Sequence, residues 1–407
     1  MKIAVILQRD PYSAEKGTYL RYKANLRALI EVCSKNNWEL NILLISSSNE
    51  LIKTINSHLK NKEQKTVKVI NIPKVELINT ADSDKFFNKF VTIYLKNPFL
   101  SLRTMAQILK DTDIAIFFEP YNQMLLAIQV WLHRRKCVVD LQNSESMLGR
   151  SILTNARSLR DKLQGLIWYA YGLFTEALFL RIANRMVVPS KVDVDSLIKY
   201  HGASNSNRLV TIPNVMDIPP EANDASYTSS SERKDVLFVG DMSYQPNRQA
   251  TEIIAKYIAP ELHQKLPQTH ICIVGRSPPQ IPNTPLNVQI LGYTPNLSVV
   301  TRRCAVAIAP LYAGAGIKYK ILTYLLYGLP VVATPKAVEG LDSEVKRFIN
   351  VVARPENFAG AILHIIDNNE DYIERCKKAR EYVLREYTTS PSFIDKWERI
   401  IQKLIKG

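Results

Sequence analysis

The sequence predicts an α/β protein with two doubly wound domains that face each other across a cleft. Short apolar runs alternate with helical patterns along most of the 407 residues, as expected for parallel sheets covered on both faces. A polar, serine-containing stretch at 219–235 has no periodicity and interrupts this alternation. A hydrophobic content of 46% and a charged content of 22% are typical of a globular protein with substantial cores.

The polar stretch separates a first domain at 1–218 from a second at 236–390, with 219–235 as the linker and a final helical pattern at 391–407. The chain opens with a buried strand rather than a signal peptide, because its apolar run is short and leads directly into Gln8-Arg9-Asp10. The candidate strands of the first domain are Lys2–Leu7, Glu39–Ile45, Thr66–Ile72, Ile114–Phe118, Lys136–Asp140, Arg185–Val188 and Leu209–Ile212.

The second domain concentrates glycine at the ends of apolar runs. Half of the fourteen glycines lie from Gly240 to Gly340, and three buried-strand patterns end at Gly240, Gly275 and Gly292. Glycine after a parallel strand lets the backbone turn sharply and approach a ligand, so we expect a nucleotide site here. The candidate binding residues are Gly240, Asp241, Tyr244, Asn247, Gly275, Arg276, Gly292, Tyr293, Gly314, Ala315, Gly316 and Ile317.

Two lysines follow the glycine pair. Gly314-Ala315-Gly316 precedes a helix expected at 317–327, whose first turn would hold Lys318 and Lys320. Cations oppose the helix dipole at that position unless an anion lies beside them, whereas backbone N–H groups there favour a phosphate. The pattern therefore favours a diphosphate site, with two solvated lysines as the alternative.

These segments carry a family resemblance. Phe238–Asn247 resembles the FxGxMxYxPN motif, and Gly314–Leu322 with Gly328-Leu329-Pro330-Val331-Val332 resembles the GxGxxxKxLE…GxPVV block, of bacterial group 1 (family 4) glycosyltransferases of GT-B fold. Glu339-Gly340-Leu341 matches the EGL that follows, and the resemblance spans roughly residues 185–390. It implies two Rossmann-like domains and a last helix that crosses back to the first domain.

The resemblance also implies an activity. The family transfers a sugar from a nucleotide sugar to an acceptor, usually with retention at the anomeric carbon, and often without a protein nucleophile because the leaving phosphate assists. It places a lysine at Lys320, and it holds the base near Gly292-Tyr293. The acceptor implied is a glycan or a lipid-linked glycan, as in surface polysaccharide biosynthesis. No cofactor beyond the donor co-substrate is implied.

The sequence departs from the family pattern at the ribose. Thr323 stands where the family has a ribose-binding glutamate, and Ala315 stands at the position of the earlier glutamate. An Arg and Lys pair for the diphosphate is also missing, which leaves Arg248 and Arg276 as nearby basic candidates. Two alternatives therefore stay open: a non-catalytic glycan-binding or scaffold protein of the same fold, and a sugar-nucleotide epimerase.

The first domain matches the family only in outline. Gly17 and Arg21 follow the first strand, and Asp140-Leu141-Gln142-Asn143-Ser144 follows another strand and faces the expected cleft. We take Asn143 as a candidate catalytic residue beside Lys318 and Lys320, because the acceptor side must also contribute groups. The cysteines and histidines are scattered without metal-ligand spacing, so we expect reduced thiols, no metal site and a metal-independent reaction.

The charge is unevenly distributed. The net charge is +15, and residues 1–218 hold 30 basic and 19 acidic side chains, or +11. We expect no nucleic-acid partner and a cytoplasmic protein that touches the anionic inner membrane face, with ordinary solvation as the alternative. The apolar segment 166–183 is not expected to span the bilayer, because it contains Glu176 and Arg181. It is either a buried helix or an interfacial element beside the basic residues Arg150, Arg157, Arg160 and Lys162.

Overall fold

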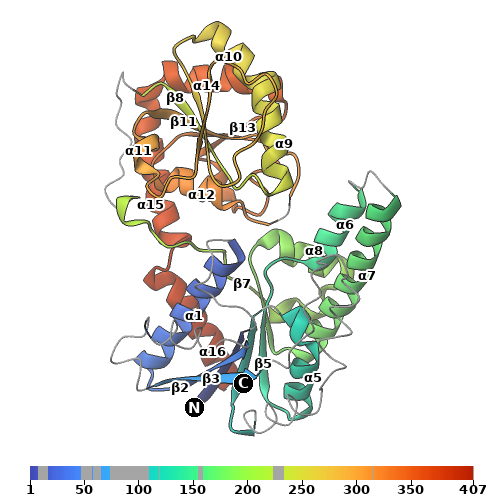
Figure 1. Cartoon of the computed structure of the whole chain (residues 1–407). Helices are drawn as coiled ribbons and strands as arrows, with labels where there is room; N and C mark the ends of the chain where they lie inside the picture. The colour runs from blue at the N-terminus through green and yellow to red at the C-terminus, as the bar shows by residue number, and fades with distance from the viewer. Residues whose placement is uncertain are drawn as a thin grey trace. The chain divides into compact units, whose positions relative to one another are not determined.

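The computed structural model describes residues 1–7, 17–46, 57, 66–73, 110–118, 120–154, 159–222, 233–314 and 316–406. Ala315, Arg157 and most of the predicted linker lie outside the described residues. The chain forms two compact units (Figure 1). Unit 1 comprises Met1–Val215 and Pro391–Gly407, and unit 2 comprises Met216–Ser390.

Unit 1 contains a parallel sheet of seven described strands in the order β3-β2-β1-β4-β5-β6-β7, a 3-2-1-4-5-6 arrangement extended by one strand. Each strand differs from its predicted range by at most one residue at either end. The strands are β1 Lys2–Leu7, β2 Glu39–Ser46, β3 Val67–Pro73, β4 Ile114–Phe118, β5 Lys136–Asp140, β6 Arg185–Val188 and β7 Leu209–Thr211.

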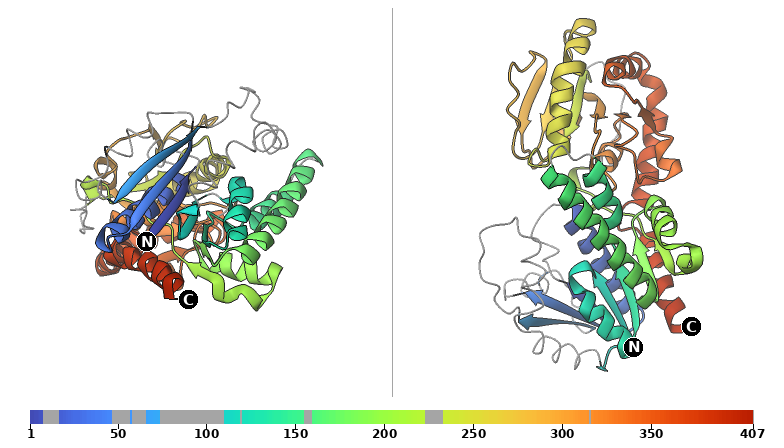
Figure 2. Two further views of the ribbon diagram at one scale, coloured as in Figure 1. Left: turned by 90° about the horizontal axis from the view of Figure 1, so that it is seen from below. Right: turned by 90° about the vertical axis from the view of Figure 1, so that its right-hand side faces the viewer.

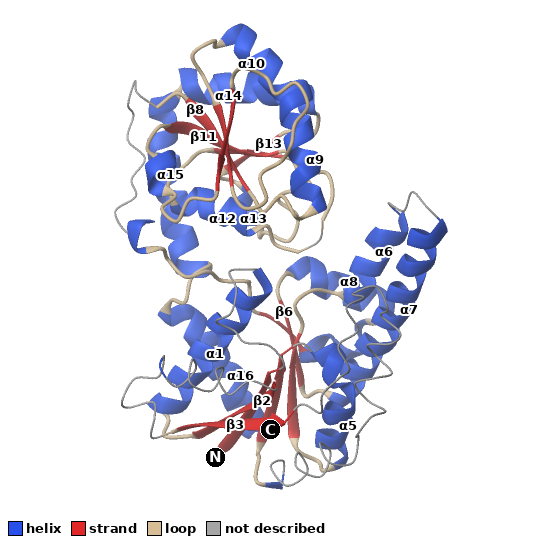
Figure 3. Ribbon diagram, in the orientation of Figure 1, coloured by secondary structure: helices blue, strands red, loops and turns tan. Residues whose placement is uncertain are grey.

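Helices cover both faces of this sheet because successive strand residues enter opposite cores (Figure 3). Ile3 and Val5 of β1 pack in one core with α1 (Gly17–Lys35) and α16 (Pro391–Lys406). Ala4 and Ile6 pack in the other core with α5 (Met124–Leu132), the end of α7 (Leu159–Ile182) and α8 (Lys191–His201). The short helix α6 spans Glu145–Thr154.

Unit 2 contains a parallel sheet of six strands in the order β10-β9-β8-β11-β12-β13. These are β8 Asp235–Val239, β9 Ile271–Val274, β10 Val288–Gly292, β11 Cys304–Ala309, β12 Val331–Ala333 and β13 Ile349–Val351. The order reverses direction between β8 and β11, so the crossover switch point lies at their carboxyl ends. The helices are α9 Gln245–Ile253, α10 Ala259–Lys265, α11 Ser298–Thr301, α12 Tyr319–Leu326, α13 Ser343–Lys346, α14 Phe358–Asp367 and α15 Asn369–Glu386.

The described parts of both units confirm the predicted α/β class with two Rossmann-like sheets. The division between them falls after Val215, three residues before the expected domain end at 218. Residues from Met216 onward belong to unit 2 because Met216 N–H donates to Tyr387 O at 2.9 Å and Ala222 is fully buried. Helix α16 belongs to unit 1, where Trp397 Nε1 donates to Asn25 Oδ1 at 3.2 Å.

Helix α7 contains the apolar segment that the sequence left open. It is a single helix over Leu159–Ile182, and only its carboxyl-terminal part enters the core of unit 1. No helix among the described residues combines the length and apolarity needed to cross a bilayer. Glu176 is fully buried and accepts from Ser144 Oγ at 2.9 Å and from Ser146 N–H at 3.1 Å.

Candidate functional site

The candidate site lies at the switch point of unit 2, where glycines join the strand ends. Gly240 follows β8, and its N–H donates to Val274 O at 2.9 Å. A Cβ on Gly275 would lie 1.7 Å from Gly240 O, and Gly275 has a φ of +144°. Gly275 N–H donates to Gly292 O at 2.8 Å. The backbones of β8, β9 and β10 therefore meet so closely that only glycine fits at Gly275.

Lys320 places its amine against this glycine turn. It comes from the first turn of α12, and a Cβ on Gly240 would lie 3.1 Å from Lys320 Nζ. The amine donates to Asn247 Oδ1 at 2.7 Å and lies 4.2 Å from the centre of the Phe238 ring. Burial, followed by the nearby charge of Lys318, lowers the pKa of Lys320 to about 7. The amine thus has an amide and an aromatic ring as neighbours, and neither of these two contacts supplies a negative charge to stabilise its charged form.

Asn247 positions Lys320. Its side chain is buried, and its Nδ2 donates to Asp241 O at 2.7 Å while its Oδ1 receives Lys320. Asp241 Oδ1 in turn accepts from Ser243 N–H at 2.9 Å. The sequence predicts that Asn247 contacts the nucleotide sugar directly, but in the structure both ends of its side-chain amide form hydrogen bonds within the protein. This arrangement makes it the residue that orients the Lys320 amine.

Arg248 binds the backbone of the loop between β8 and α9. Its Nη1 donates to Met242 O at 3.0 Å and to Ser243 O at 2.9 Å. Sequence reasoning proposed Arg248 as a basic group for a diphosphate. In the structure these two bonds make Arg248 a brace for the loop between β8 and α9.

Lys318 precedes α12 instead of lying in its first turn. Its φ of −89° and ψ of 98° are extended, so the helix begins at Tyr319, two residues later than expected. The side chain is buried, and Nζ donates to Gly316 O at 2.6 Å. Burial lowers the pKa of Lys318 to about 8, although the nearby Glu339 opposes that shift. Two buried amines thus lie near each other at the start of α12.

The glycine-rich turn before α12 needs its glycines. Gly314 and Gly316 have φ values of +106° and +71°, which disfavour other residues. A Cβ on Gly314 would lie 2.9 Å from the hydroxyl of Tyr244, so this exposed tyrosine lies over the turn. Ile317 is buried and lies against Gly340. The structure thus brings Tyr244, Gly314, Gly316, Ile317 and Lys318 together.

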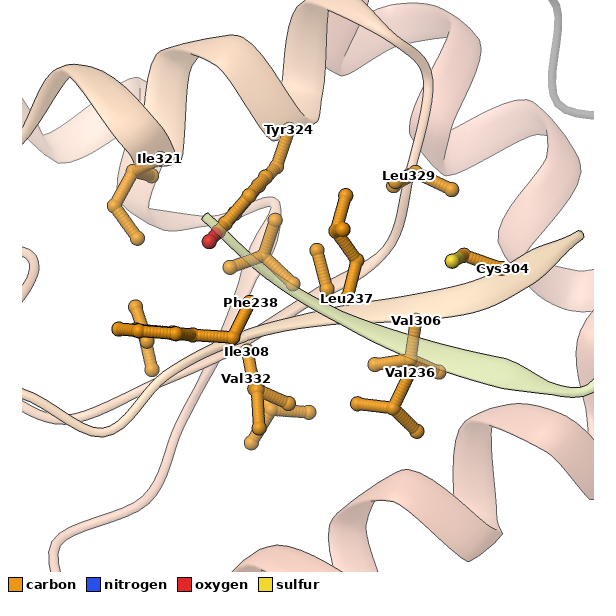
Figure 4. Close-up of a cluster of buried hydrophobic side chains, with 14 of the residues drawn as sticks. Val236, Leu237, Phe238, Cys304, Val306, Ile308, Ile321, Tyr324, Leu329 and Val332 are labelled. Atoms are coloured by element: carbon orange, nitrogen blue, oxygen red, sulfur yellow. The ribbon is translucent and has the colours of Figure 1, made fainter. Parts of the chain in front are cut away.

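A hydrogen bond and core packing hold helix α12 against β8 (Figure 4). Val239 N–H donates to the Tyr324 hydroxyl at 2.8 Å, and Tyr324 packs beside Phe238 and Ile321 in the core. This contact fixes the helix that carries Lys320 relative to the strand that carries Gly240. Sequence reasoning noted Phe238 only as part of a motif and missed Tyr324, since an aromatic residue in an apolar run gives no signal beyond core packing.

Thr323 lies on the same helix. It is half-buried, and its hydroxyl donates to Tyr319 O at 3.0 Å, one helical turn earlier. Such back-bonding to the helix is common for threonine and leaves the oxygen as an acceptor. Thr323 therefore provides a hydroxyl oxygen at this position and no carboxylate.

Arg276 and Tyr293 form a stacked pair at the ends of β9 and β10. The guanidinium carbon lies 5.2 Å from the centre of the Tyr293 ring, and Tyr293 is 54% exposed. Gly292, with a φ of +69°, turns the chain into Tyr293. A planar cation on an exposed ring offers a surface on which a flat heterocycle can stack.

A family model decides what this region is. Residues 233–368 match the model described as Glycosyl transferases group 1. This segment is similar to the group 1 glycosyltransferases. It contains all of the candidate residues discussed so far, from Phe238 to Gly340.

Solved structures extend the likeness to the whole chain. HepE from Anabaena, solved in complex with UDP-glucose, is 14% identical over 100% of both chains, with a TM-score of 0.59. TarM is 12% identical over 100% of this chain and 99% of its own, with a TM-score of 0.65. WaaG, a glycosyltransferase involved in lipopolysaccharide biosynthesis, is 14% identical over 98% and 99%, with a TM-score of 0.59. These likenesses show the GT-B fold. No curated protein sequence matches the chain.

The remaining candidate residue, Asn143, lies in unit 1. It is half-buried in the loop after β5. The end of that strand is anchored by Asp140, which accepts from Arg21 Nη2 at 2.5 Å and from Asn25 Nδ2 at 2.8 Å, all fully buried. Arg21, aligned only in outline with the family, thus acts here as a buried structural partner that holds the loop carrying Asn143.

Proposed function

We propose that this protein is a retaining glycosyltransferase that moves a sugar from a nucleotide-sugar donor to a glycan or lipid-linked acceptor in surface polysaccharide biosynthesis. The observation that carries the proposal is the pair of lysines at the switch point of unit 2, Lys318 with a buried side chain and Lys320 with a half-buried one, whose pKa values are both lowered by desolvation. Burying two amines side by side is unfavourable by itself, and a diphosphate would offset that cost.

The lysines supply the main chemical effect. As the bond from the anomeric carbon to the diphosphate breaks, negative charge grows on the departing phosphate, and a fixed ammonium stabilises that charge. Lys320, held by Asn247, is the group oriented for this role, and Lys318 shares the charge. The acceptor oxygen bonds to the anomeric carbon on the face from which the phosphate leaves, and its proton passes to that phosphate, so the configuration is retained. The two amines can do this without a metal, and Asn143 would orient the acceptor.

Uracil is the base we propose first. HepE has been solved with UDP-glucose and with UDP. In this chain the Arg276–Tyr293 pair would stack with a planar base, and the strand-end glycines would admit the ribose and phosphates. Stacking on an aromatic ring accepts every base, so the choice among them needs a direct measurement.

The first experiment is a thermal-shift screen against UDP, GDP, CDP, TDP and ADP. A ligand at a hundredfold excess over its Kd adds about 2.7 kcal/mol to the stability of the folded state, which is readily measured. We expect UDP to stabilise the protein and the matching UDP-sugar to be consumed when acceptor is added. A protein that responds to no nucleotide would contradict the proposal.

Lys320→Ala tests the assigned chemistry. Loss of a charge contact formed mainly in the transition state lowers turnover by about two to three orders of magnitude. Lys378→Ala, at a solvent-exposed lysine of the same unit, is the matched control and leaves turnover unchanged. Wild-type turnover by a folded Lys320→Ala protein would remove Lys320 from the mechanism.

Thr323 favours one alternative, a non-catalytic glycan-binding protein of the same fold. The residue back-bonds to its own helix and offers no carboxylate for a ribose. Nucleotide binding without transfer or donor hydrolysis would support that alternative. Hydrolysis of the donor in the absence of acceptor would support the transferase.

A further inference from the structure

Helices α6 and α7 form an arm of unit 1, and their upper ends stand clear of its sheet (Figures 1 and 2). The two helices pack at backbone distance. A Cβ on Gly149 would lie 2.3 Å from Tyr169 N, and a Cβ on Gly172 would lie 2.3 Å from Ser146 N. Gly165 meets Leu153 N at 2.6 Å in the same way. These close contacts make the arm a rigid element even though the first half of α7 contributes nothing to the core of the sheet.

The opposite side of α7 exposes large apolar side chains. Leu159 is 85% exposed, Leu163 60% and Phe174 61%, with Leu166 at 50% and Ile167 at 46%. We call these five residues the α7 stripe. At about 100° per residue they fall within a sector of roughly 100°, and the sector lies roughly opposite Gly165 and Gly172. The stripe is therefore the face turned directly away from α6, and it is about 22 Å long at 1.5 Å per residue.

Charge surrounds the stripe in a definite pattern. Lys162 and Arg160 fall on its two sides near the start of α7, and Arg181 lies at its far end, all exposed. The carboxylate of Glu176, by contrast, is turned inward and bonded to Ser144 and Ser146. Asp161 remains the exposed acidic residue of the helix. Basic residues thus border an apolar face whose middle carries no exposed carboxylate.

We propose that the α7 stripe docks this protein on an anionic lipid bilayer, with α7 lying in the plane of the interface. Interfacial helices bury an apolar face to a depth of roughly 5–10 Å and keep basic residues at the headgroups, which matches the stripe and its flanking charges. Each basic residue near an anionic surface strengthens partitioning about fivefold. The inference does not depend on sugar transfer.

A bilayer fits this face better than a second copy of the chain. Residues 1–218 carry a net charge of +11, so two copies that met through their α7 stripes would bring like charges together. An anionic surface is complementary to the same charges. The sequence left the apolar segment 166–183 open between a buried helix and an interfacial element, and the structure adds which of the apolar side chains of α7 are exposed.

The test is co-sedimentation of the full chain with vesicles. The vesicles are equimolar phosphatidylglycerol and phosphatidylcholine, or phosphatidylcholine alone, at low and high salt. We expect binding to the anionic vesicles at low salt. Leu163→Gln/Phe174→Gln should weaken it by about tenfold or more for each side chain withdrawn from lipid. Lys162→Gln/Arg181→Gln should weaken it by about fivefold per residue and reduce its salt dependence.

A matched control separates docking through the α7 stripe from nonspecific hydrophobic adsorption to the vesicles. Leu286 of unit 2 is 91% exposed, so Leu286→Gln makes the same chemical change far along the chain and should leave vesicle binding unchanged. Thermal unfolding of each variant checks that it is folded. Binding that survives the Leu163/Phe174 change overturns the proposal, as does a failure of the wild type to bind. A concentration-dependent dimer that the same double variant abolishes, without vesicle binding, would instead assign the stripe to a second copy.

Discussion

At the scale of single residues, the buried amine of Lys320 is the group on which the chemistry depends. Its pKa is about 7 and that of Lys318 about 8, both lowered mainly by burial. A free lysine is charged throughout the physiological range, whereas these two titrate within it. An anionic ligand favours their charged forms, so its binding must take up protons wherever the empty site is neutral.

Affinity for a nucleoside diphosphate should therefore fall as the pH rises. Above about pH 7 for Lys320 and pH 8 for Lys318, each amine that must be charged weakens binding by up to about tenfold per pH unit. Calorimetry of UDP binding from pH 6.5 to 9, in buffers of different ionisation enthalpy, measures both Kd and proton uptake. A Kd that stays constant over that range would show that the amines keep their protons in the empty site.

Asn247→Asp provides the matched control for this linkage. The change places a carboxylate 2.7 Å from the Lys320 amine and raises its pKa. The part of the pH dependence that belongs to Lys320 should disappear. The affinity for UDP should also fall, because the new carboxylate pairs with the ammonium group that the diphosphate would otherwise bind.

Thr323 gives the second prediction at this scale. Its place on α12 aligns it with the family's ribose-binding glutamate, so Thr323→Glu should tighten donor binding. A carboxylate that accepts from a ribose hydroxyl forms a charge-assisted bond of about 1.5–3 kcal/mol, or roughly 10- to 100-fold in Kd. Titration with UDP measures it, with uracil, which lacks the ribose, as the control ligand. An unchanged or weaker Kd would mean that ribose recognition has moved to other residues.

Some of these roles could be predicted from residue type alone, and others could not. The sequence predicted Lys318 and Lys320 as site residues because two cations at the expected start of a helix are unfavourable unless an anion lies beside them. Asn247 was visible as a polar residue after a strand, but its partner, 73 positions later in the chain, could not be read from spacing. The extended backbone at Lys318 was also hidden, because the apolar pattern of the helix continues through Ile317.

At the scale of secondary-structure elements, the strands were predictable and the surfaces of the helices were not. A strand buried on both faces must be apolar throughout, so its ends appear as polar residues or glycine. Helix α7 is apolar on two opposite sides, and the sequence cannot tell which side packs. The answer depended on Gly165 and Gly172, which allow α6 to approach one side to backbone distance.

The strand-end turn at Gly275 should be intolerant of any side chain. Gly275→Ala places a methyl group 1.7 Å from Gly240 O at a φ of +144°, so the turn must break. We expect a loss of several kcal/mol of stability, within the range for severe backbone strain. Gly360→Ala is the control, because its added Cβ in α14 meets no atom within 4 Å and should stabilise that helix by about 0.5–1 kcal/mol. Urea denaturation compares them; equal stabilities would refute the close approach of β8 and β9.

At the scale of the whole molecule, unit 1 is assembled from both ends of the chain. Phe393, Trp397 and Ile401 of α16 lie in the same core as Ile3 and Val5 of β1. Lys35 of α1 also pairs with Glu398 at 2.8 Å. The polar stretch at 219–235 indicated a division into two domains, and the family resemblance supplied the return of the last helix. The sequence could not place Asn143 relative to Lys320, because they lie in different units.

A chain that ends at Ser390 should lose unit 1 selectively. The truncation removes three fully buried side chains, Phe393, Trp397 and Ile401, each of which contributes about 1.5–3 kcal/mol or more by burial. Unit 2 retains its entire core and should stay folded. Hydrogen exchange should show rapid exchange over β1–β5 with protection kept over β8–β12. A chain ending at Leu404, which keeps all three side chains, is the control; retained protection of β1 after the longer truncation would contradict the prediction.

The split composition of unit 1 also sets an order of events during translation. All of unit 2 is synthesised before Pro391, so the core of unit 1, which includes α16, cannot be completed until the second unit has been made. At roughly 5–20 residues per second, the 192 residues from 216 to 407 take about 10–40 s to synthesise. Throughout that interval the nascent amino-terminal half lacks the buried side chains of α16 that complete its core. We therefore expect the amino-terminal half to bind chaperones more readily than unit 2 while the protein is being made, until α16 packs into its core.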